Sequence, residues 1–258
     1  MFDRLQKPFL TVETGEGCQP NRTTWHVKQK EPLINALEKL QCIRKNTSAN
    51  SWDLFWTAEC DALHFESMDA FRKNPENPVR LGSFSLRDDR FYFNTSSFKR
   101  ACLVLPFIHD AVTKDSAHLF CTDFINKVFA IDERLPHGFA ELFKDEELDR
   151  ILSQRISDYH QVKEQCEHAS TADEAFTVLA EYAKKEAQKR LPYAERYYFK
   201  TEEQTDPEVI FLAFYIFLRS RELVAIKRWY GETGYTLADA NEDTIEKVFG
   251  EMGLDIID

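Results

Sequence analysis

The sequence predicts an α+β fold: an N-terminal mixed α/β unit with a small, mainly antiparallel sheet, followed by an all-α C-terminal helical bundle. Apolar residues alternate in several short runs before residue 135, as in half-buried strands, and recur at helical spacing after it. The charge changes at the same place. Residues 1–129 carry 17 Lys and Arg against 16 Asp and Glu, whereas residues 130–258 carry 16 against 28. We therefore expect a mixed α/β domain over 1–135 and an acidic all-helical domain over 136–258.

The N-terminal part begins with short elements. Residues 8–14 alternate and contain β-branched side chains, which predicts a strand that ends in a turn over 15–17. Apolar residues recur at helical spacing over 31–44, and every second residue is apolar at the start of 52–63. We expect a helix and then a strand at these places. Ser67 is expected to cap a short helix through residue 71.

The clearest local pattern is a β-hairpin. Two runs of alternating apolar residues, 79–86 and 90–95, are joined by a short polar turn. Ser96 or Ser97 follows at once, and either can cap a helix from Phe98 onward because its hydroxyl accepts a hydrogen bond from an amide of the first turn. The predicted order is therefore strand, strand and capped helix.

Two segments after the hairpin allow alternatives. Pro106 removes a backbone donor and clashes with the preceding turn, so the helix that begins at Phe98 either kinks at Pro106 or ends near Leu105. A strand over 101–105 is the alternative. Residues 118–129 fit a helix or a strand, and we expect a strand followed by a loop.

In the second half of the chain, apolar residues recur at helical spacing. The expected helices cover 139–143, 145–166, 171–190, 207–231 and 241–252. Thr171 and Glu174 form a capping box at the start of the third of these helices. The fourth helix is apolar on nearly every side, which is typical of a central, buried helix.

Composition narrows the class of protein. The longest apolar run, 209–218, is too short for a helix across a bilayer about 30 Å thick. Charged residues interrupt the N-terminus where a signal peptide needs an apolar stretch. The six cysteines show no Cys-x-x-Cys spacing, so we expect reduced thiols. Together these features predict a cytoplasmic protein without a membrane partner, a metal or a cofactor.

One candidate binding surface lies on the hairpin and the helix start. Basic side chains and serine hydroxyls gather there, beside backbone amides that suit a phosphate or a carboxylate. Phe91, Tyr92 and Phe93 add rings on which nucleic-acid bases stack. The competing interpretation is structural, because Asp88 and Asp89 offset the arginines and alternating aromatics commonly line a core. The candidate anion- or nucleic-acid-binding residues are Arg80, Arg87, Arg90, Ser96, Ser97, Lys99 and Arg100.

A second candidate surface consists of aromatic and arginine residues that flank the ends of the apolar helix over 207–231. Tyr, Trp and Arg are the residue types that anchor protein interfaces. Amphipathic aromatics also commonly complete a core at its wet edge, which is the competing interpretation. The candidate partner-interface residues are Tyr193, Arg196, Tyr197, Tyr198, Arg228, Trp229, Tyr230 and Tyr235.

No catalytic set stands out in the sequence. It contains neither a Gly-x-Ser-x-Gly elbow nor a glycine-rich phosphate loop. An enzyme that acts on an anion at Ser96 and Ser97 would need a general base, for which His109 and His118 are the available candidates. The catalytic residues stay unknown, and the pattern favours a protein that is not an enzyme.

These observations lead to one leading function and its alternatives. We expect a cytosolic, non-catalytic interaction or regulatory protein that binds a protein partner through its helical C-terminal part, with the acidic surface contributing selectivity. The alternatives are a nucleic-acid-associated protein that uses the basic and aromatic N-terminal sheet, and an enzyme acting on an anionic small molecule. The acidic half could also mimic nucleic acid towards a DNA-binding partner.

Overall fold

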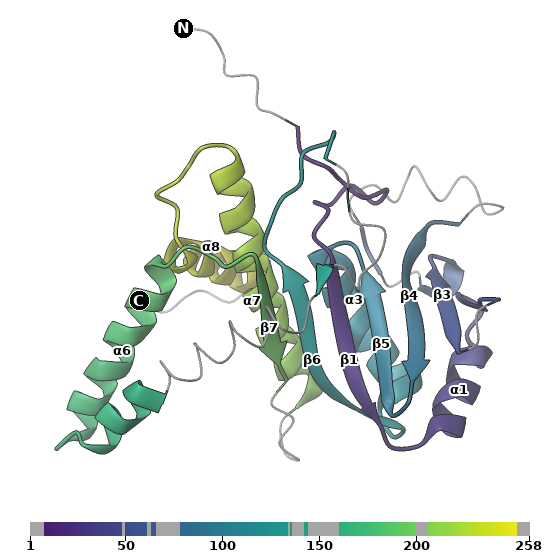
Figure 1. Ribbon diagram of the computed structural model, residues 1–258, viewed down its shortest axis with the longest axis horizontal. Helices are drawn as coiled ribbons and strands as arrows, with labels where there is room; N and C mark the ends of the chain where they lie inside the picture. The colour runs from purple at the N-terminus through teal and green to yellow at the C-terminus, as the bar shows by residue number, and fades with distance from the viewer. Residues whose placement is uncertain are drawn as a thin grey trace, which may run out of the picture.

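The fold is α+β and is built on one antiparallel sheet (Figure 1). The computed structural model describes residues 8–47, 50–60, 63–65, 78–133, 135, 142–143, 160–199 and 206–251. In this part of the chain the sheet has seven strands in the order β2-β3-β4-β5-β1-β6-β7. The strands are β1 (Asn21–Val27), β2 (Ile43–Lys45), β3 (Ser51–Phe55), β4 (Arg80–Arg87), β5 (Arg90–Thr95), β6 (Ala117–Ile125) and β7 (Ala194–Tyr198).

Helices cover one face of this sheet and extend beyond its β7 edge (Figure 1). They are α1 (Lys30–Lys39), α3 (Phe98–Ile108), α6 (Ala172–Gln188), α7 (Pro207–Trp229) and α8 (Leu237–Glu251), with a 3-10 turn η1 (Ala58–Cys60) and a π-helical turn η2 (His109–Thr113) that continues α3. α1, α3 and α7 bury their apolar sides against the sheet, whereas α8 packs on α7 and α6 packs on α8. None of the helices that the structure describes is both long enough and apolar enough to cross a membrane.

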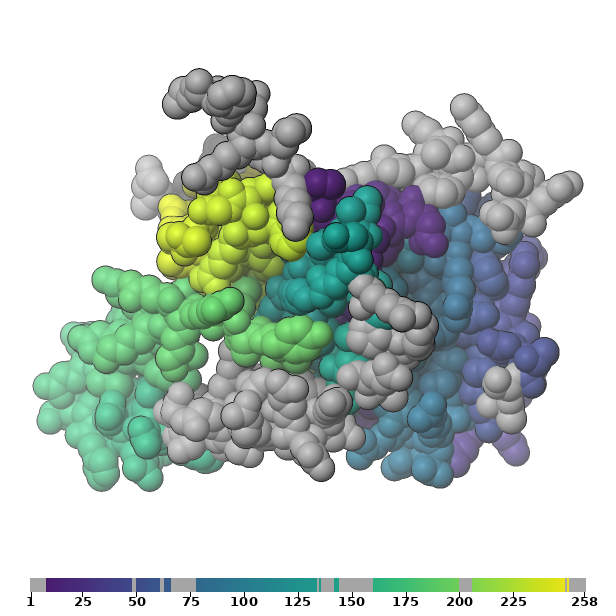
Figure 2. Space-filling view, turned by 45° about the horizontal axis from the view of Figure 1, so that its top comes forward, coloured from purple at the N-terminus to yellow at the C-terminus, as the bar shows by residue number. Residues whose placement is uncertain are grey.

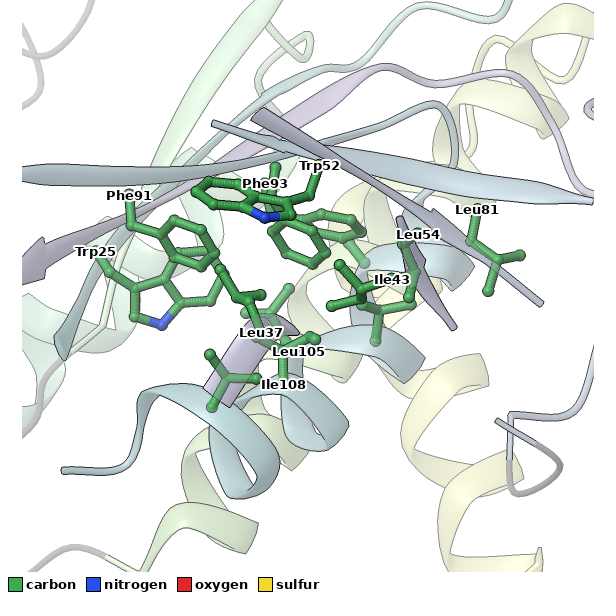
Figure 3. Close-up of a cluster of buried hydrophobic side chains, with 14 of the residues drawn as sticks. Trp25, Leu37, Ile43, Trp52, Leu54, Leu81, Phe91, Phe93, Leu105 and Ile108 are labelled. Carbon is green, nitrogen blue, oxygen red and sulfur yellow. The ribbon is translucent and has the colours of Figure 1, made fainter. Parts of the chain in front are cut away.

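The main core lies between the sheet and the layer of α1, α3 and α7 (Figure 3). Its largest fully buried side chains include Trp25, Trp52, Phe84, Phe91, Phe93, Phe98, Phe124 and Phe214. The Phe84 ring stacks on both Phe91 and Phe93, with ring centroids 5.3 and 4.7 Å apart. Because burial of one such ring contributes about 1.5–3 kcal/mol, this aromatic layer is a large part of the driving force for folding.

Gly82 allows the aromatic layer to lie flat against β4. A Cβ atom at Gly82 would lie 2.5 Å from the Phe93 ring and 2.6 Å from the Asn94 carbonyl oxygen. Only a residue without a Cβ therefore fits between β4 and the neighbouring Phe93 side chain.

The opposite face of the sheet, which we call the outer face, carries a smaller apolar cluster. Ile125, Phe129, Phe143 and Ala194 are buried together, with Leu10, Leu135 and Leu142 packed around them. The Arg22 guanidinium of β1 lies over the Phe143 ring at 5.6 Å. The cluster covers the end of the outer face where β6 leaves the sheet and β7 enters it.

Several local predictions are confirmed. β4 and β5 form the predicted hairpin, and Asp88 in its turn adopts a positive φ of 51°. The Ser97 hydroxyl accepts a hydrogen bond from the Arg100 amide at 3.0 Å, as a helix N-cap should. β6 is a strand, which is the alternative that we expected over 118–129.

The C-terminal helix predictions are confirmed in part. Thr171 accepts a hydrogen bond from the Glu174 amide, and the Glu174 carboxylate accepts one from the Ser170 amide, which completes a capping box around the start of α6. α7 has the expected position, and α8 begins earlier than expected, at Leu237. Residues 160–167 are helical, but the rest of the helix expected over 145–166 and the helix expected over 67–71 lie outside the described residues. Of the helix expected over 139–143, only residues 142 and 143 are described.

The Pro106 alternatives resolve in favour of a continuous helix. Pro106 lies inside α3, and the chain stays helical through η2, where the turn widens to the π form. The strand considered over 101–105 is wrong. Proline lacks the amide that would bond a carbonyl of the preceding turn, yet the backbone stays helical on both sides of Pro106.

Other predictions about where elements lie and end are wrong. The segment over 8–14 makes only isolated bridges, from Phe9 to Ala130 and from Thr11 to Gly17. The helix expected over 31–44 ends at Lys39, because Ile43 and the residues after it pair with β3. The strand expected over 52–63 ends at Phe55. Only for the helix does pairing with another strand explain where the element ends.

Three strands were not predicted, and one of them, β2, begins within the helix expected over 31–44. β1 is paired on both sides, with β5 and β6, although it contains polar residues at buried positions such as Asn21 and Thr23. β7 lies in the part of the chain that was expected to be all-helical, so that expectation is wrong at Ala194–Tyr198. β7 extends the sheet and α7 packs on α3, so the sheet and its core include segments from both sides of residue 135. The division into two domains at that residue stays a prediction.

Candidate functional site

The start of α3, one of the candidate anion sites, holds a carboxylate of the chain itself. The buried Ser97 hydroxyl donates a hydrogen bond to Glu16 Oε1 at 3.0 Å. Arg100 is also buried, and its Nε lies 3.7 Å from the same oxygen. A helix N-terminus and a guanidinium both favour negative charge. The Glu16 carboxylate therefore supplies, from within the chain, the negative charge that the sequence pattern suggested a bound anion would supply.

A cleft of about 610 Å³ opens beside this cluster, between the segment 10–13 and the ends of β4 and β5. It brings together three of the predicted anion-binding residues, Arg80, Ser96 and Arg100. Both guanidiniums already have acidic partners, since Arg80 pairs with Asp53 at 2.5 Å and Arg100 with Glu13 at 3.1 Å. The cleft thus offers polar groups to a ligand, but acidic side chains of the chain already compensate the positive charge of its two arginines.

The other predicted anion-binding residues lie elsewhere. Arg87 and Arg90 are exposed at the turn of the hairpin, at the opposite end of β4 and β5 from Arg80 and Ser96. Lys99 lies on the other side of α3, where it lines a small cavity with Glu222 and Lys247. The structure therefore separates the predicted set into three places.

The predicted partner-interface residues are also divided, since β7 places Tyr197 and Tyr198 on opposite faces of the sheet. Tyr197 packs in the main core against Phe199, Phe214 and Phe217, and burial raises its pKa. Tyr198 lies on the outer face and is 44% exposed.

Arg196 is occupied by an ion pair within the sheet. Its guanidinium makes a two-pronged contact with the buried Asp123 carboxylate, at 2.5 and 3.1 Å. Burial opposes the charged form of Arg196, but this contact raises its pKa overall. The pair fastens β7 to β6.

The remaining interface candidates lie near the ends of β7 and α7. Tyr193 precedes β7 and is exposed, and its carbonyl accepts a hydrogen bond from the Asn126 amide at 2.9 Å. Arg228, Trp229 and Tyr230 end α7, and the Tyr230 ring contacts Phe9. The Tyr235 hydroxyl donates to Asp243 at 2.5 Å, and burial together with that carboxylate raises the tyrosine pKa. Arg196 and Tyr197 are thus engaged within the sheet and the main core, and Tyr198, Tyr230 and Tyr235 also contact other side chains of the fold.

The most exposed apolar surface in the described C-terminal part belongs to α6, which was not singled out in the sequence. Phe176 is 73% exposed and Leu179 is 46% exposed, and no residue of α6 is buried. With Ala172 and Ala183, which are also exposed, they form what we call the α6 stripe. Figures 1 and 2 show α6 at one end of the molecule, away from the sheet. The 4-3-4 spacing of the stripe, visible in the sequence, is the signal that could have identified it.

The inner side of α6 faces a groove of about 650 Å³. Its lining includes Tyr182, Ala183 and Ala187 of α6, with Ile216 of α7 and Ile245 of α8, so the C-terminal end of the α6 stripe borders this groove. α6 therefore stands apart from the rest of the molecule along much of its length.

No group of three or more His, Cys, Asp or Glu side chains in the described residues could hold a metal ion. All six cysteines are free thiols. His109 and His118, the candidate bases, lie in η2 and on the outer face of β6, so neither lies at the start of α3. Comparison with protein-family models, with curated proteins and with solved structures finds no match to this chain.

Proposed function

We propose that the protein binds a protein partner through the α6 stripe, as an interaction or regulatory protein and not as an enzyme. The observation that carries this proposal is the exposure of Phe176 and Leu179 on a capped helix that has no buried residue. Burial of these two side chains would contribute about 1.5–3 kcal/mol each. Large exposed apolar residues grouped on one surface are typical of interaction sites.

The stripe suits an amphipathic helix of the partner. Its four residues follow the spacing of the apolar seam in a coiled coil, over roughly 16 Å of helix. Ala175 and Ala180 flank the seam, and their small side chains allow a second helix to approach closely. The partner is therefore expected to contribute a helix with an apolar seam of the same length.

The test uses the full chain with the double substitution Phe176→Glu and Leu179→Glu. Partners recovered from the source cells and measured by quantitative mass spectrometry should fall at least about tenfold, because two charges would replace the buried seam. The matched control, Thr177→Glu with Gln188→Glu, adds the same two charges to α6 outside the stripe. It should recover the partner as the unchanged protein does.

A photo-crosslinking residue at position 176 tests the contact directly. It should form a covalent link to the protein that the double substitution loses. Unchanged recovery with the double substitution, or crosslinks only to a second copy of this chain, would refute a partner bound at this stripe.

We further propose a cytoplasmic location. The six free thiols support it, since an oxidising compartment favours disulfides. Cell fractionation with an antibody to the full chain tests this directly, and recovery in a secreted fraction would contradict it.

A further inference from the structure

The outer face of the sheet carries a row of aromatic rings that the proposed protein contact does not use. They are Tyr92, His26, Phe120 and Tyr198, on the adjacent strands β5, β1, β6 and β7. The His26 and Phe120 ring centroids are 4.5 Å apart, and those of Phe120 and Tyr198 are 5.5 Å apart. Tyr198 is 44% exposed and the other three are half-buried, and the Arg22 guanidinium lies over the Tyr92 ring at 5.6 Å. The row spans about 14 Å, since neighbouring strands lie about 4.8 Å apart.

A β-bulge places Phe120 in this row. Thr24 pairs with Cys121 and Trp25 pairs with Leu119, so Phe120 is an additional residue in β6. Without the bulge, alternation would turn Phe120 towards the core face, because its neighbour Cys121 lies on the outer face. The contacts with His26 and Tyr198 show that its ring lies with theirs.

Basic side chains border the aromatic row at the hairpin end of the sheet. Arg87, Arg90, His26 and His118 pair in succession across β4, β5, β1 and β6, so they occupy one line of the outer face. Arg87 and Arg90 are exposed, and Lys28 follows β1 at the same end. Asp123, further along β6, forms an ion pair with Arg196. Asp88 and Asp89, in the hairpin turn, are acidic side chains that lie next to Arg87 and Arg90 in the sequence.

We propose that this part of the outer face binds single-stranded RNA. Unpaired bases stack on exposed strand aromatics whatever their sequence, whereas a duplex hides its base faces. The row has room for about two or three stacked bases. Arg87, Arg90 and Lys28 lie where they can contact the phosphates. Ser85, paired with Tyr92 in the register, offers a hydroxyl to the ribose 2′-OH of a base stacked on that ring.

The net charge of the chain sets how this binding should behave. At −11 the molecule repels a polyanion as a whole, so affinity depends on a few local contacts. Three phosphate contacts predict a slope of about −2 when the logarithm of the binding constant is plotted against that of the salt concentration.

The first experiment is fluorescence anisotropy of a labelled RNA strand of about ten nucleotides, titrated with the full chain at about 50 mM and about 200 mM salt. Tyr198→Ala and Tyr92→Ala should each weaken binding about fivefold or more, because each removes one stacking platform. Tyr198→Phe keeps the ring and should bind as the unchanged protein does.

The charge contribution is tested separately. Arg87→Ala with Arg90→Ala should reduce the salt slope by about 1.4, as expected for two lost phosphate contacts. Lys184→Ala with Lys185→Ala removes the same charge from α6 and should leave the slope unchanged. Because α6 is not part of this surface, failure of RNA binding leaves the proposed protein contact standing, and the converse also holds.

Crosslinking of the unchanged protein to RNA that contains 4-thiouridine supplies a readout that needs no substitution. The crosslinked peptides should contain Tyr92, Phe120 or Tyr198. Absence of binding at the lower salt concentration, Tyr198→Ala binding as well as Tyr198→Phe, or crosslinks only on other surfaces would overturn the proposal. Equal or tighter binding of the matching DNA strand would overturn the assignment to RNA.

Discussion

Glu195 of β7 is the most tightly held charged side chain of the C-terminal part, with an exposed fraction of 1%. Its carboxylate accepts hydrogen bonds from Arg221 Nε at 2.8 Å and from Asn126 Nδ2 at 2.6 Å. These contacts join β7 to α7 and to the residue that follows β6. A buried charge needs such partners, because burial without them costs several kcal/mol.

Substitution of one partner should therefore be costly. Arg221→Met is expected to lower the free energy of unfolding by about 3–5 kcal/mol, since it leaves the Glu195 carboxylate buried without its counter-ion. Urea-unfolding curves measure the change. In the exposed pair Lys45–Glu38, the substitution Lys45→Ala should cost under about 1 kcal/mol. If the two substitutions lowered the free energy of unfolding equally, the Arg221–Glu195 pair would contribute no more to stability than an exposed ion pair.

His109 is a second residue whose environment has a measurable consequence. Its ring packs edge-on against Phe211 of α7, with centroids 5.5 Å apart. Burial, and then the nearby Lys114, lower its pKa, whereas Asp110 and Asp115 act in the opposite direction. The ring is thus held neutral at a pH where the unfolded chain would protonate it.

The pH dependence follows from this difference. As the pH falls below the ordinary histidine value of about 6.5, the unfolded state binds a proton that the folded state does not, so stability decreases. His109→Phe keeps an aromatic ring against Phe211 and should lose less stability than the unchanged protein between about pH 8 and pH 5. Urea-unfolding curves at several pH values measure this. The pKa of His118 is also lowered, but that residue is present in both proteins and does not affect the comparison. Parallel pH profiles would contradict the assignment to His109.

Among the elements, α6 depends on its N-terminal cap, because it has no buried residue to hold it. Most helices in proteins are stabilised by burial of an apolar side, whereas the packed side of α6 is only half-buried. The Thr171 hydroxyl accepts the Glu174 amide at 3.2 Å, and the Glu174 carboxylate accepts the Ser170 amide at 2.7 Å. These local contacts account for a helix at this exposed position.

Thr171→Ala should therefore destabilise α6 by about 1 kcal/mol. Hydrogen exchange should become faster over α6 and stay unchanged in β1 and β5, which lie in the centre of the sheet. Thr177→Ala, within the same helix, removes only a hydroxyl that bonds the Asp173 carbonyl and should not speed exchange. Faster exchange throughout the sheet would show that α6 is coupled to the core.

At the scale of the whole molecule, one core joins segments from both halves of the sequence. Phe214 and Leu218 of α7 are buried in the same cluster as Trp25 and Trp52 of the sheet. β7 continues the sheet beyond β6. The charge change near residue 130 therefore occurs between segments that pack together.

This arrangement predicts a single unfolding transition. Core amides of β5 and of α7 should lose protection at the same denaturant concentration, because neither segment buries its apolar side without the other. Hydrogen exchange measured across a urea series gives both values in one experiment. Two separate midpoints would support the division into domains at residue 135.

The candidate surfaces show where inference from sequence stopped. Arg87, Arg90 and Tyr92 belong to one strand pair, so a hairpin pattern places them close together. His26, Phe120 and Tyr198 come from three other strands, and two of those strands were not predicted. Phe120 joins the row only through a bulge that depends on how β1 pairs with β6.

By itself the sequence determined the elements that depend on near neighbours: the hairpin of β4 and β5, the Ser97 and Thr171 caps and the apolar helix α7. Tertiary structure alone decided β1 and β7. Asn21 is buried because its amide reaches the Ser97 carbonyl, 76 residues away, and Glu195 is buried because Arg221 lies across from it. Polar residues hide the alternation that marks a strand, and the partners that make their burial possible are known only once the chain has folded.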